Sequence, residues 1–117
     1  MSLVRLTIRG ISYSQTQNGA YALILDEVGG ERKLPIVIGA YEAQSIAIAL
    51  EKEIKPPRPL THDLFINVFS LIDVSLDFVE ITRFNDGVFF AELNLLNDDK
   101  HIVVDARPSD AIALAIR

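Results

Sequence analysis

The stretch that most constrains the fold runs from residue 34 to residue 63 and reads LPIVIGAYEAQSIAIALEKEIKPPRPLTHD. It begins with a short apolar run that stops at Gly39, a residue type that adopts backbone angles other residues avoid. Apolar residues then recur at the spacing of one helix face, at Ala43, Ile46, Ala47, Leu50 and Ile54. Prolines end this helix, because proline lacks the backbone N–H and disfavours a helical residue before it; they are Pro56, Pro57 and Pro59. The sequence therefore predicts a strand, a helix and a stiff connection, in that order.

A second helix is predicted directly after these prolines. Thr61 stands where an N-cap belongs, and the helix is expected to continue to about Ile72. Its apolar residues form a wide face, made of Leu64, Phe65, Val68, Phe69 and Ile72. The corner between the two helices also carries Arg58, His62 and Asp63, which makes it the first candidate for a functional site.

The residues before the first helix alternate between apolar and polar side chains, as strands with one buried face do. Three strands are predicted, over residues 3–13, 20–28 and 31–38. Asn18-Gly19 and Gly29-Gly30 are typical of the tight turns between them. Pro35 places the third strand at a sheet edge or beside a bulge.

A second three-strand meander follows the helix pair, over residues 75–84, 88–96 and 100–106. Its turns are Asn85-Asp86-Gly87 and Asn97-Asp98-Asp99. A last helix opens at Arg107-Pro108-Ser109-Asp110. The predicted fold class is therefore α+β, with two antiparallel three-strand meanders, a helix pair between them and a C-terminal helix.

That last helix is apolar on nearly every side, so we expect it to be buried or covered by another subunit. A homo-oligomer through this helix is the assembly that the sequence predicts. Its start also repeats an earlier pattern, because RPLTHD (58–63) and RPSD (107–110) both place Arg-Pro, a hydroxyl and an acid at a helix start.

The length of 117 residues predicts one domain over residues 1–117. No apolar run approaches the roughly 20 residues of a membrane span, no signal peptide is evident, and cysteine is absent, so we expect a cytoplasmic protein without a membrane partner. The net charge is −5, and residues 60–117 hold four Lys and Arg against ten Asp and Glu. Binding nucleic acid through a general basic excess is therefore not expected.

Three blocks of the chain, LPIVIGAYEAQSIAIALE, RPLTHDL and VDARPSDAIALAIR, resemble the bifunctional nuclease domain family in order and spacing. The resemblance implies an α+β fold of antiparallel sheet and a few helices, oligomeric assembly, and nuclease activity on DNA and RNA. It also implies that a further C-terminal piece follows Arg117 in many members. The positions that lie in the shared blocks are Glu42, Arg58, His62, Asp63, Asp105, Arg107, Ser109 and Asp110.

These residue types suit phosphodiester hydrolysis, which needs a positioned water, charge stabilisation on phosphate and a proton donor for the leaving oxygen. The catalytic candidates are His62, Asp63 and Glu42. The candidates for binding phosphate, or nucleic acid as a partner, are Arg58, Arg107 and Ser109. The candidate ligands for a divalent metal, Mg²⁺ or Mn²⁺, are Glu42, Asp63, Asp105 and Asp110.

Each candidate also has a structural interpretation. Thr61 and Ser109 fit N-caps, and Asp63 and Asp110 fit first helical turns. The arginines fit ion pairs with these acids, and His62 fits a structural histidine. The alternative function is therefore a non-catalytic oligomeric module that binds a small anion or a protein partner.

Overall fold

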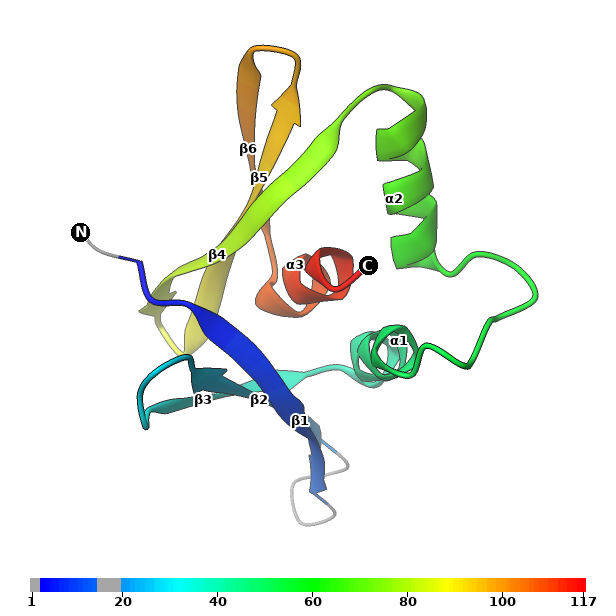
Figure 1. Ribbon diagram of the computed structural model, residues 1–117. Coiled ribbons are helices and arrows are strands. Elements are labelled where there is room, and N and C mark those ends of the chain that lie inside the picture. The colour runs from blue at the N-terminus through cyan, green and yellow to red at the C-terminus, as the bar shows by residue number, and fades with distance from the viewer. Residues whose placement is uncertain (1–2, 15–19) are drawn as a thin grey trace. The chain divides into compact units, whose positions relative to one another are not determined.

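The computed structural model describes residues 3–14 and 20–117, and the chain divides into two compact units, Met1–Ala43 and Gln44–Arg117 (Figure 1). The first unit holds a meander in the order β1-β2-β3. Both strand pairs are antiparallel, and the strands are β1 (Leu6–Ser14), β2 (Ala20–Glu27) and β3 (Lys33–Ile38). The meander is confirmed, whereas the Asn18-Gly19 turn predicted within it lies outside the described residues.

The third strand lies at the edge of its sheet, as Pro35 predicted. It starts at Lys33, two residues later than expected, because the preceding residue belongs to the turn. There the Glu27 N–H donates to the Arg32 carbonyl at 3.0 Å, and Gly29 adopts a φ of 79° that favours glycine.

The second unit holds the other meander, in the order β4-β5-β6. Its strands are β4 (Ser75–Asn85), β5 (Val88–Asn97) and β6 (Lys100–Ala106), again paired antiparallel. The turn between β4 and β5 has φ values of 52° at Asp86 and 77° at Gly87. Positive φ at both central residues matches the twist of a two-residue hairpin, which explains the residue choice there.

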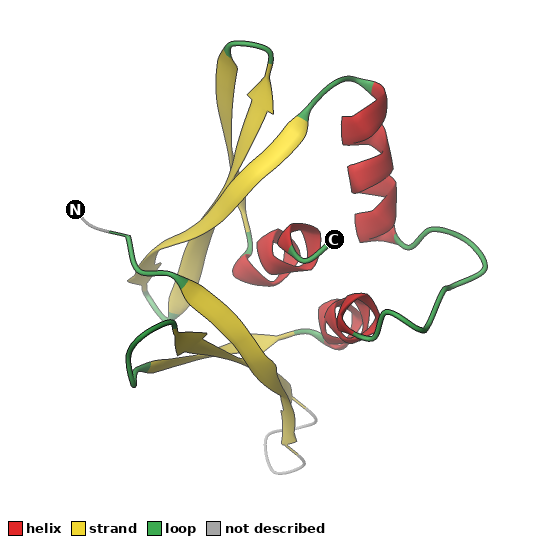
Figure 2. Cartoon of the chain, in the orientation of Figure 1, coloured by secondary structure: helices red, strands yellow, loops and turns green. Residues whose placement is uncertain are grey.

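Three helices accompany the strands: α1 (Ala40–Leu50), α2 (Thr61–Leu71) and α3 (Pro108–Ala115) (Figure 2). The predicted α+β class, with two three-strand meanders and helices between and after them, is confirmed. The organisation of residues 1–117 as one domain stays a prediction. Within the described ranges, no helix is long and apolar enough to cross a membrane.

The core of the second unit forms between β5 and α3. Buried side chains of Ala91, Leu93 and Leu95 pack against Ala111 and Leu114, and Ile66 and Phe69 of α2 pack onto this cluster from one side. The apolar residues of α3 are thus buried by the chain itself, which leaves its predicted contact with another subunit as a prediction.

Two details of the helix pair differ from expectation. The face that was predicted to reach Ile54 is cut short, because α1 ends at Leu50 and the Ile54 N–H donates to Glu51 O in a turn. Pro56 and Pro57 lack the N–H groups that a further helical turn requires. On α2, part of the predicted apolar face is exposed: Leu64 and Phe65 lie in solvent, since the sheet and α3 contact the helix through Ile66 and Phe69.

Truncating the core of the second unit tests this packing. Leu114 is 5% exposed, and we expect Leu114→Ala to lower the free energy of unfolding by about 2–5 kcal/mol, because a cavity replaces the lost side chain. Val88, which is 56% exposed at the start of β5, provides the control, and Val88→Ala is expected to change the free energy of unfolding by less than about 1 kcal/mol. Urea denaturation followed by circular dichroism measures both values. Equal losses in the two variants would contradict the assigned core.

Candidate functional site

His62 lies between two hydrogen-bonding side chains that come from other helices of the second unit. Its Nδ1 is 2.7 Å from the Ser45 Oγ of α1, and its Nε2 is 2.9 Å from the Asp110 Oδ1 of α3. The His62 side chain is 12% exposed, and Ser45 is 6% exposed. A nearly buried histidine is therefore held at both ring nitrogens by groups 17 and 48 residues away in the sequence.

The partners of His62 fix the proton positions in the neutral ring. The Asp110 carboxylate is an acceptor only, so Nε2–H donates to it. Ser45 Oγ accepts a hydrogen bond from the Arg117 Nη2 at 2.8 Å, which leaves the Ser45 O–H to donate to His62 Nδ1. The order acid, imidazole, hydroxyl is the one that makes a hydroxyl proton transferable to a histidine.

Arg117 connects all three helices of this unit. Its side chain is 7% exposed, and its Nε donates to Asp63 Oδ1 at 2.7 Å. Its Nη1 donates to Ala113 O at 2.6 Å, and its Nη2 also approaches Ser45 O at 3.3 Å. A buried guanidinium needs this many acceptors, because each unmatched N–H would cost free energy. The group of Ser45, His62, Asp63, Arg107, Asp110 and Arg117 is called the His62 cluster below.

Asp63 has a second task at the start of α2. Its Oδ2 accepts the Leu60 N–H at 2.9 Å, so Leu60 is the N-cap residue and Thr61 already lies inside the helix. The prediction that Thr61 and Ser109 are N-caps is wrong, because both residues lie inside their helices. The cap of α3 is Arg107, because a residue before proline is held extended and Pro108 takes the first helical position.

Asp110 accepts hydrogen bonds from two cationic or polar groups. Besides His62, the Arg107 Nε and Nη2 donate to Asp110 Oδ2 at 3.0 and 2.8 Å. Burial alone would raise the pKa of Asp110, but the hydrogen bonds from His62 and Arg107 lower it below its usual value. Burial also acts to raise the pKa of Asp63. The hydrogen bonds that Asp63 accepts from Arg117 and Leu60 outweigh burial, so the pKa of Asp63 is lowered as well.

Within the second unit, hydrogen bonds bring His62, Asp63, Arg107 and Asp110 into the cluster, all of which the sequence indicated. Asp105 lies at the end of β6 opposite Glu92, and Ser109 is buried in the first turn of α3. Arg58 is exposed in the connection between α1 and α2, and Glu42 lies in the first turn of α1, in the first unit.

Two members of the His62 cluster were missed by sequence reasoning. Ser45 lies within an apolar helix, where a serine is usually interpreted as a small core residue. Arg117 follows the last helix without a motif of its own.

The cluster does not have the arrangement of the predicted metal site. Within residues 3–14 and 20–117, no group of three or more His, Asp and Glu side chains is placed to hold a metal ion. Asp63 and Asp110 each accept hydrogen bonds from an arginine, at 2.7 Å from Arg117 and at 2.8 Å from Arg107. The metal site stays a prediction.

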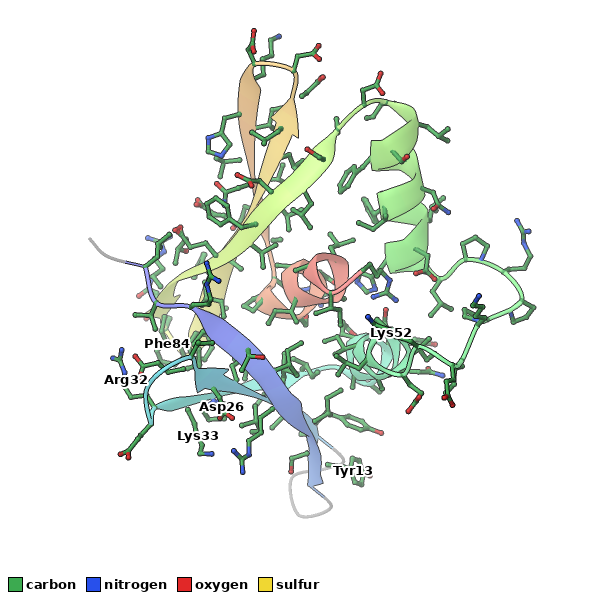
Figure 3. All side chains as sticks on the ribbon, in the orientation of Figure 1. Tyr13, Asp26, Arg32, Lys33, Lys52 and Phe84 are labelled. Atoms are coloured by element: carbon green, nitrogen blue, oxygen red, sulfur yellow. The ribbon has the colours of Figure 1, made fainter. Side chains whose placement is uncertain are left out.

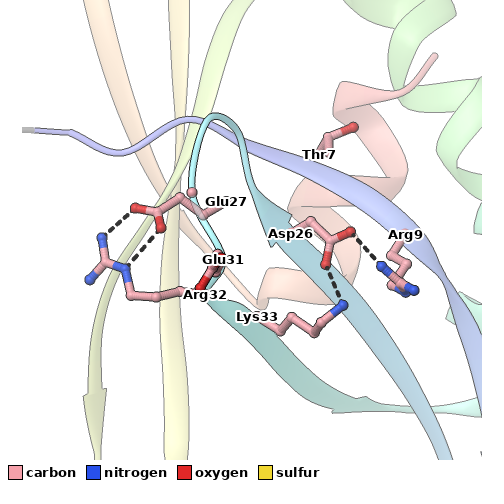
Figure 4. Close-up of a pocket in the computed structure, with 8 residues that line it drawn as sticks. Thr7, Arg9, Asp26, Glu27, Glu31, Arg32 and Lys33 are labelled. Carbon is pink, nitrogen blue, oxygen red and sulfur yellow. Dashed lines mark hydrogen bonds and ion pairs between the residues drawn. The ribbon is translucent and has the colours of Figure 1, made fainter.

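A separate hollow of about 480 Å³ in the first unit is charged but balanced (Figure 4). Asp26 lies between Arg9, at 3.2 Å, and Lys33, at 3.6 Å. Glu27 accepts two hydrogen bonds from Arg32 across the turn. Each cation named here is paired with an acid of the same sheet, so this hollow offers little charge to a phosphate.

The two lowered pKa values predict acid sensitivity of folding. Because the folded pKa of Asp63 lies below its unfolded value, the stabilisation is complete above about pH 4 and is lost as the pH falls through the folded pKa. We expect Asp63→Asn to make the free energy of unfolding less dependent on pH below about pH 4. Urea denaturation at several pH values measures this slope, with Asp77→Asn on β4 as the control. A slope unchanged in Asp63→Asn would contradict the assigned role of the Arg117 bond.

The sequence of this chain is similar to those of known proteins. Two uncharacterized proteins of Mycobacterium tuberculosis, MT1877 of strain CDC 1551 / Oshkosh and Rv1829 of strain H37Rv, are each 46% identical to this chain over 109 residues. The aligned part covers 92% of this chain and 63% of each relative, so the chain spans less than two thirds of their length.

The sequence profile of the bifunctional nuclease domain matches residues 23–117. This range contains the entire second unit and every residue of the His62 cluster. The chain belongs to the bifunctional nuclease domain family.

Proposed function

We propose that this nuclease-like domain hydrolyses phosphodiester bonds of DNA and RNA, with His62 as the proton acceptor. Family membership supports the reaction class. The observation that carries the proposal is the pair of hydrogen bonds at His62, to Asp110 at 2.9 Å and to Ser45 at 2.7 Å. An imidazole whose tautomer is fixed by a carboxylate accepts a proton at its other nitrogen.

In the proposed reaction, a proton is relayed from the attacking water through Ser45 and His62 to the leaving oxygen. A water attacks phosphorus and gives a proton to the Ser45 oxygen, while the Ser45 proton moves to His62 Nδ1. The bond from phosphorus to the leaving oxygen breaks, and the imidazolium returns the proton to that oxygen. Asp110 stabilises the imidazolium through its bond to Nε2.

In this proposal an arginine, and not a broadly basic surface, neutralises the negative charge of the phosphate. Arg107 is the most exposed cation of the cluster, at 69%, and its guanidinium is bonded to Asp110 next to His62. A guanidinium can bind two phosphate oxygens at once, which suits the charge that develops during hydrolysis. The acidic net charge of −5 is compatible with such a local contact, because screening limits the reach of distant charges.

Cleavage assays with matched histidine variants test this proposal. Single-stranded DNA, double-stranded DNA and RNA are incubated with purified protein in Mg²⁺, in Mn²⁺ and in EDTA. We expect His62→Gln to reduce the cleavage rate by about 10²–10⁴-fold, because the proton acceptor is lost. His101→Gln is the control, since His101 of β6 forms a hydrogen bond with Asn94 of β5 and lies outside the cluster.

The assays in Mg²⁺, in Mn²⁺ and in EDTA decide whether cleavage needs a divalent metal. Activity in EDTA would mean that the His62 cluster suffices, and activity only with Mg²⁺ or Mn²⁺ would support the metal assistance expected from the sequence. Full activity of His62→Gln under every condition would contradict the assigned site.

A second candidate function, assembly without catalysis, is favoured by the surface of α2. Leu64, Phe65 and Val68 are 55, 50 and 43% exposed on one helix of the second unit. Neighbouring apolar side chains of this size are typical of contact surfaces between proteins. We therefore propose that a second copy of this chain contacts α2, while assembly through α3 stays a prediction.

Sedimentation analysis of a single variant tests this assembly. We expect Phe65→Glu to shift an oligomer toward monomer, because a charge would be buried in an apolar contact. Glu80→Gln on β4 serves as the surface control. An oligomer of unchanged size in Phe65→Glu would exclude the α2 contact.

A further inference from the structure

A groove of about 530 Å³ opens in the second unit beside the His62 cluster. It lies among the end of α1, the proline-rich connection, α2 and the residues that follow α3. Its volume is in the range of about 300–1,000 Å³ that small ligands occupy in proteins. This space, called the basic groove below, is distinct from the balanced hollow of the first unit.

Two lysines give the basic groove its charge. Lys52 lies just after α1 (Figure 3), and Lys55 lies in the connection that follows. Both are exposed, and no acid forms an ion pair with either of them in the part of the chain that the structure describes. This contrasts with Lys33 of the first unit, which is 3.6 Å from Asp26. The groove therefore presents two available positive charges in a protein with an acidic balance.

The walls of the basic groove are aliphatic. Ile48, Ile54, Ile66 and Ile116 line it, and Ile54 is 54% exposed. A wall of this kind contacts the face of a flat, apolar ring, whereas the lysines attract an anion. A ligand that matches both has a charged group and an exposed ring a short distance apart. Nucleotides in a single strand have both, because their bases are not hidden in a pair stack.

The basic groove also reaches the proposed reaction centre. Asp63 and Arg117 belong both to its lining and to the His62 cluster. Arg117 in turn donates to the Ser45 Oγ that bonds His62. A strand lying in the groove would thus be separated from the proton relay by a single side chain.

We propose that the basic groove binds single-stranded nucleic acid. Lys52 and Lys55 contact its phosphates, and the isoleucine walls contact its bases. This inference rests on the proposed function, since the single strand bound in the groove would be the substrate that the same domain cleaves. A duplex fits less well, because its base faces are stacked and cannot contact the walls.

Binding is tested by fluorescence anisotropy with a labelled ten-nucleotide oligothymidine in EDTA, and electrophoresis of the recovered oligothymidine confirms that it stays uncleaved during the reading. We expect Lys52→Ala/Lys55→Ala to weaken binding by roughly tenfold or more. The slope of the logarithm of the binding constant against the logarithm of salt concentration should fall by about 0.7 for each phosphate that the variant no longer neutralises. The matched control is Lys33→Ala/Lys100→Ala, which removes the same net charge elsewhere and should retain the affinity and the slope.

A second variant separates base contact from phosphate contact. Ile54→Ala removes part of one wall, and we expect weaker binding of the oligothymidine with an unchanged salt slope. A ten-base-pair duplex should bind more weakly than the single strand to the unaltered protein. Duplex binding as tight as that of the single strand would overturn the proposed substrate form.

The outcomes also separate this inference from the proposed function. Equal losses of affinity in the two double-lysine variants would overturn the groove even if the protein cleaves nucleic acid. Binding that depends on Lys52 and Lys55, in a protein that cleaves nothing, would support the groove and reject the nuclease proposal. Polyglutamate that binds as tightly, with the same dependence on the two lysines, would assign the groove to acidic peptides and overturn the inference.

Discussion

The buried guanidinium of Arg117 is the interaction on which the second unit depends. It bonds a carboxylate of α2, a carbonyl of α3 and both the hydroxyl and the carbonyl of Ser45 on α1. A positive charge that is 7% exposed is tolerated only when acceptors surround it, so the three helices must keep the spacing that its planar fork allows. The position of His62 follows from that spacing, because its two partners lie on two of these helices.

Helix α2 has three roles, which its eleven residues share. Its first turn supplies His62 and Asp63 to the cluster, Ile66 and Phe69 attach it to the core, and Leu64 and Phe65 remain exposed. Side chains at successive positions of a helix point in different directions, so the three tasks do not compete for the same surface. The wide apolar pattern predicted the helix, and it did not distinguish the residues that reach the core from those that stay exposed.

The strands and four of the six cluster residues were predictable because their signals are local. Period-two alternation and the Asp86-Gly87 turn define the second meander without reference to any distant residue. The repeated Arg-Pro pattern led to His62, Asp63, Arg107 and Asp110, since both copies start helices. Ser45 and Arg117 depend instead on contacts between residues 72 positions apart, and no local pattern encodes such a contact. The cap of α2 was misplaced for a different reason: Asp63 lies inside the helix and accepts the N–H of Leu60, three residues before it.

The proline-rich connection between α1 and α2 has an entropic consequence. Pro56, Pro57 and Pro59 restrict the backbone of a segment that also carries Lys55 and Ile54 to the basic groove. A chain whose φ angles are already fixed loses little conformational freedom when a ligand arrives. Such a wall gives up less entropy on binding than a glycine-rich loop of the same length would, so more of the contact energy remains as affinity.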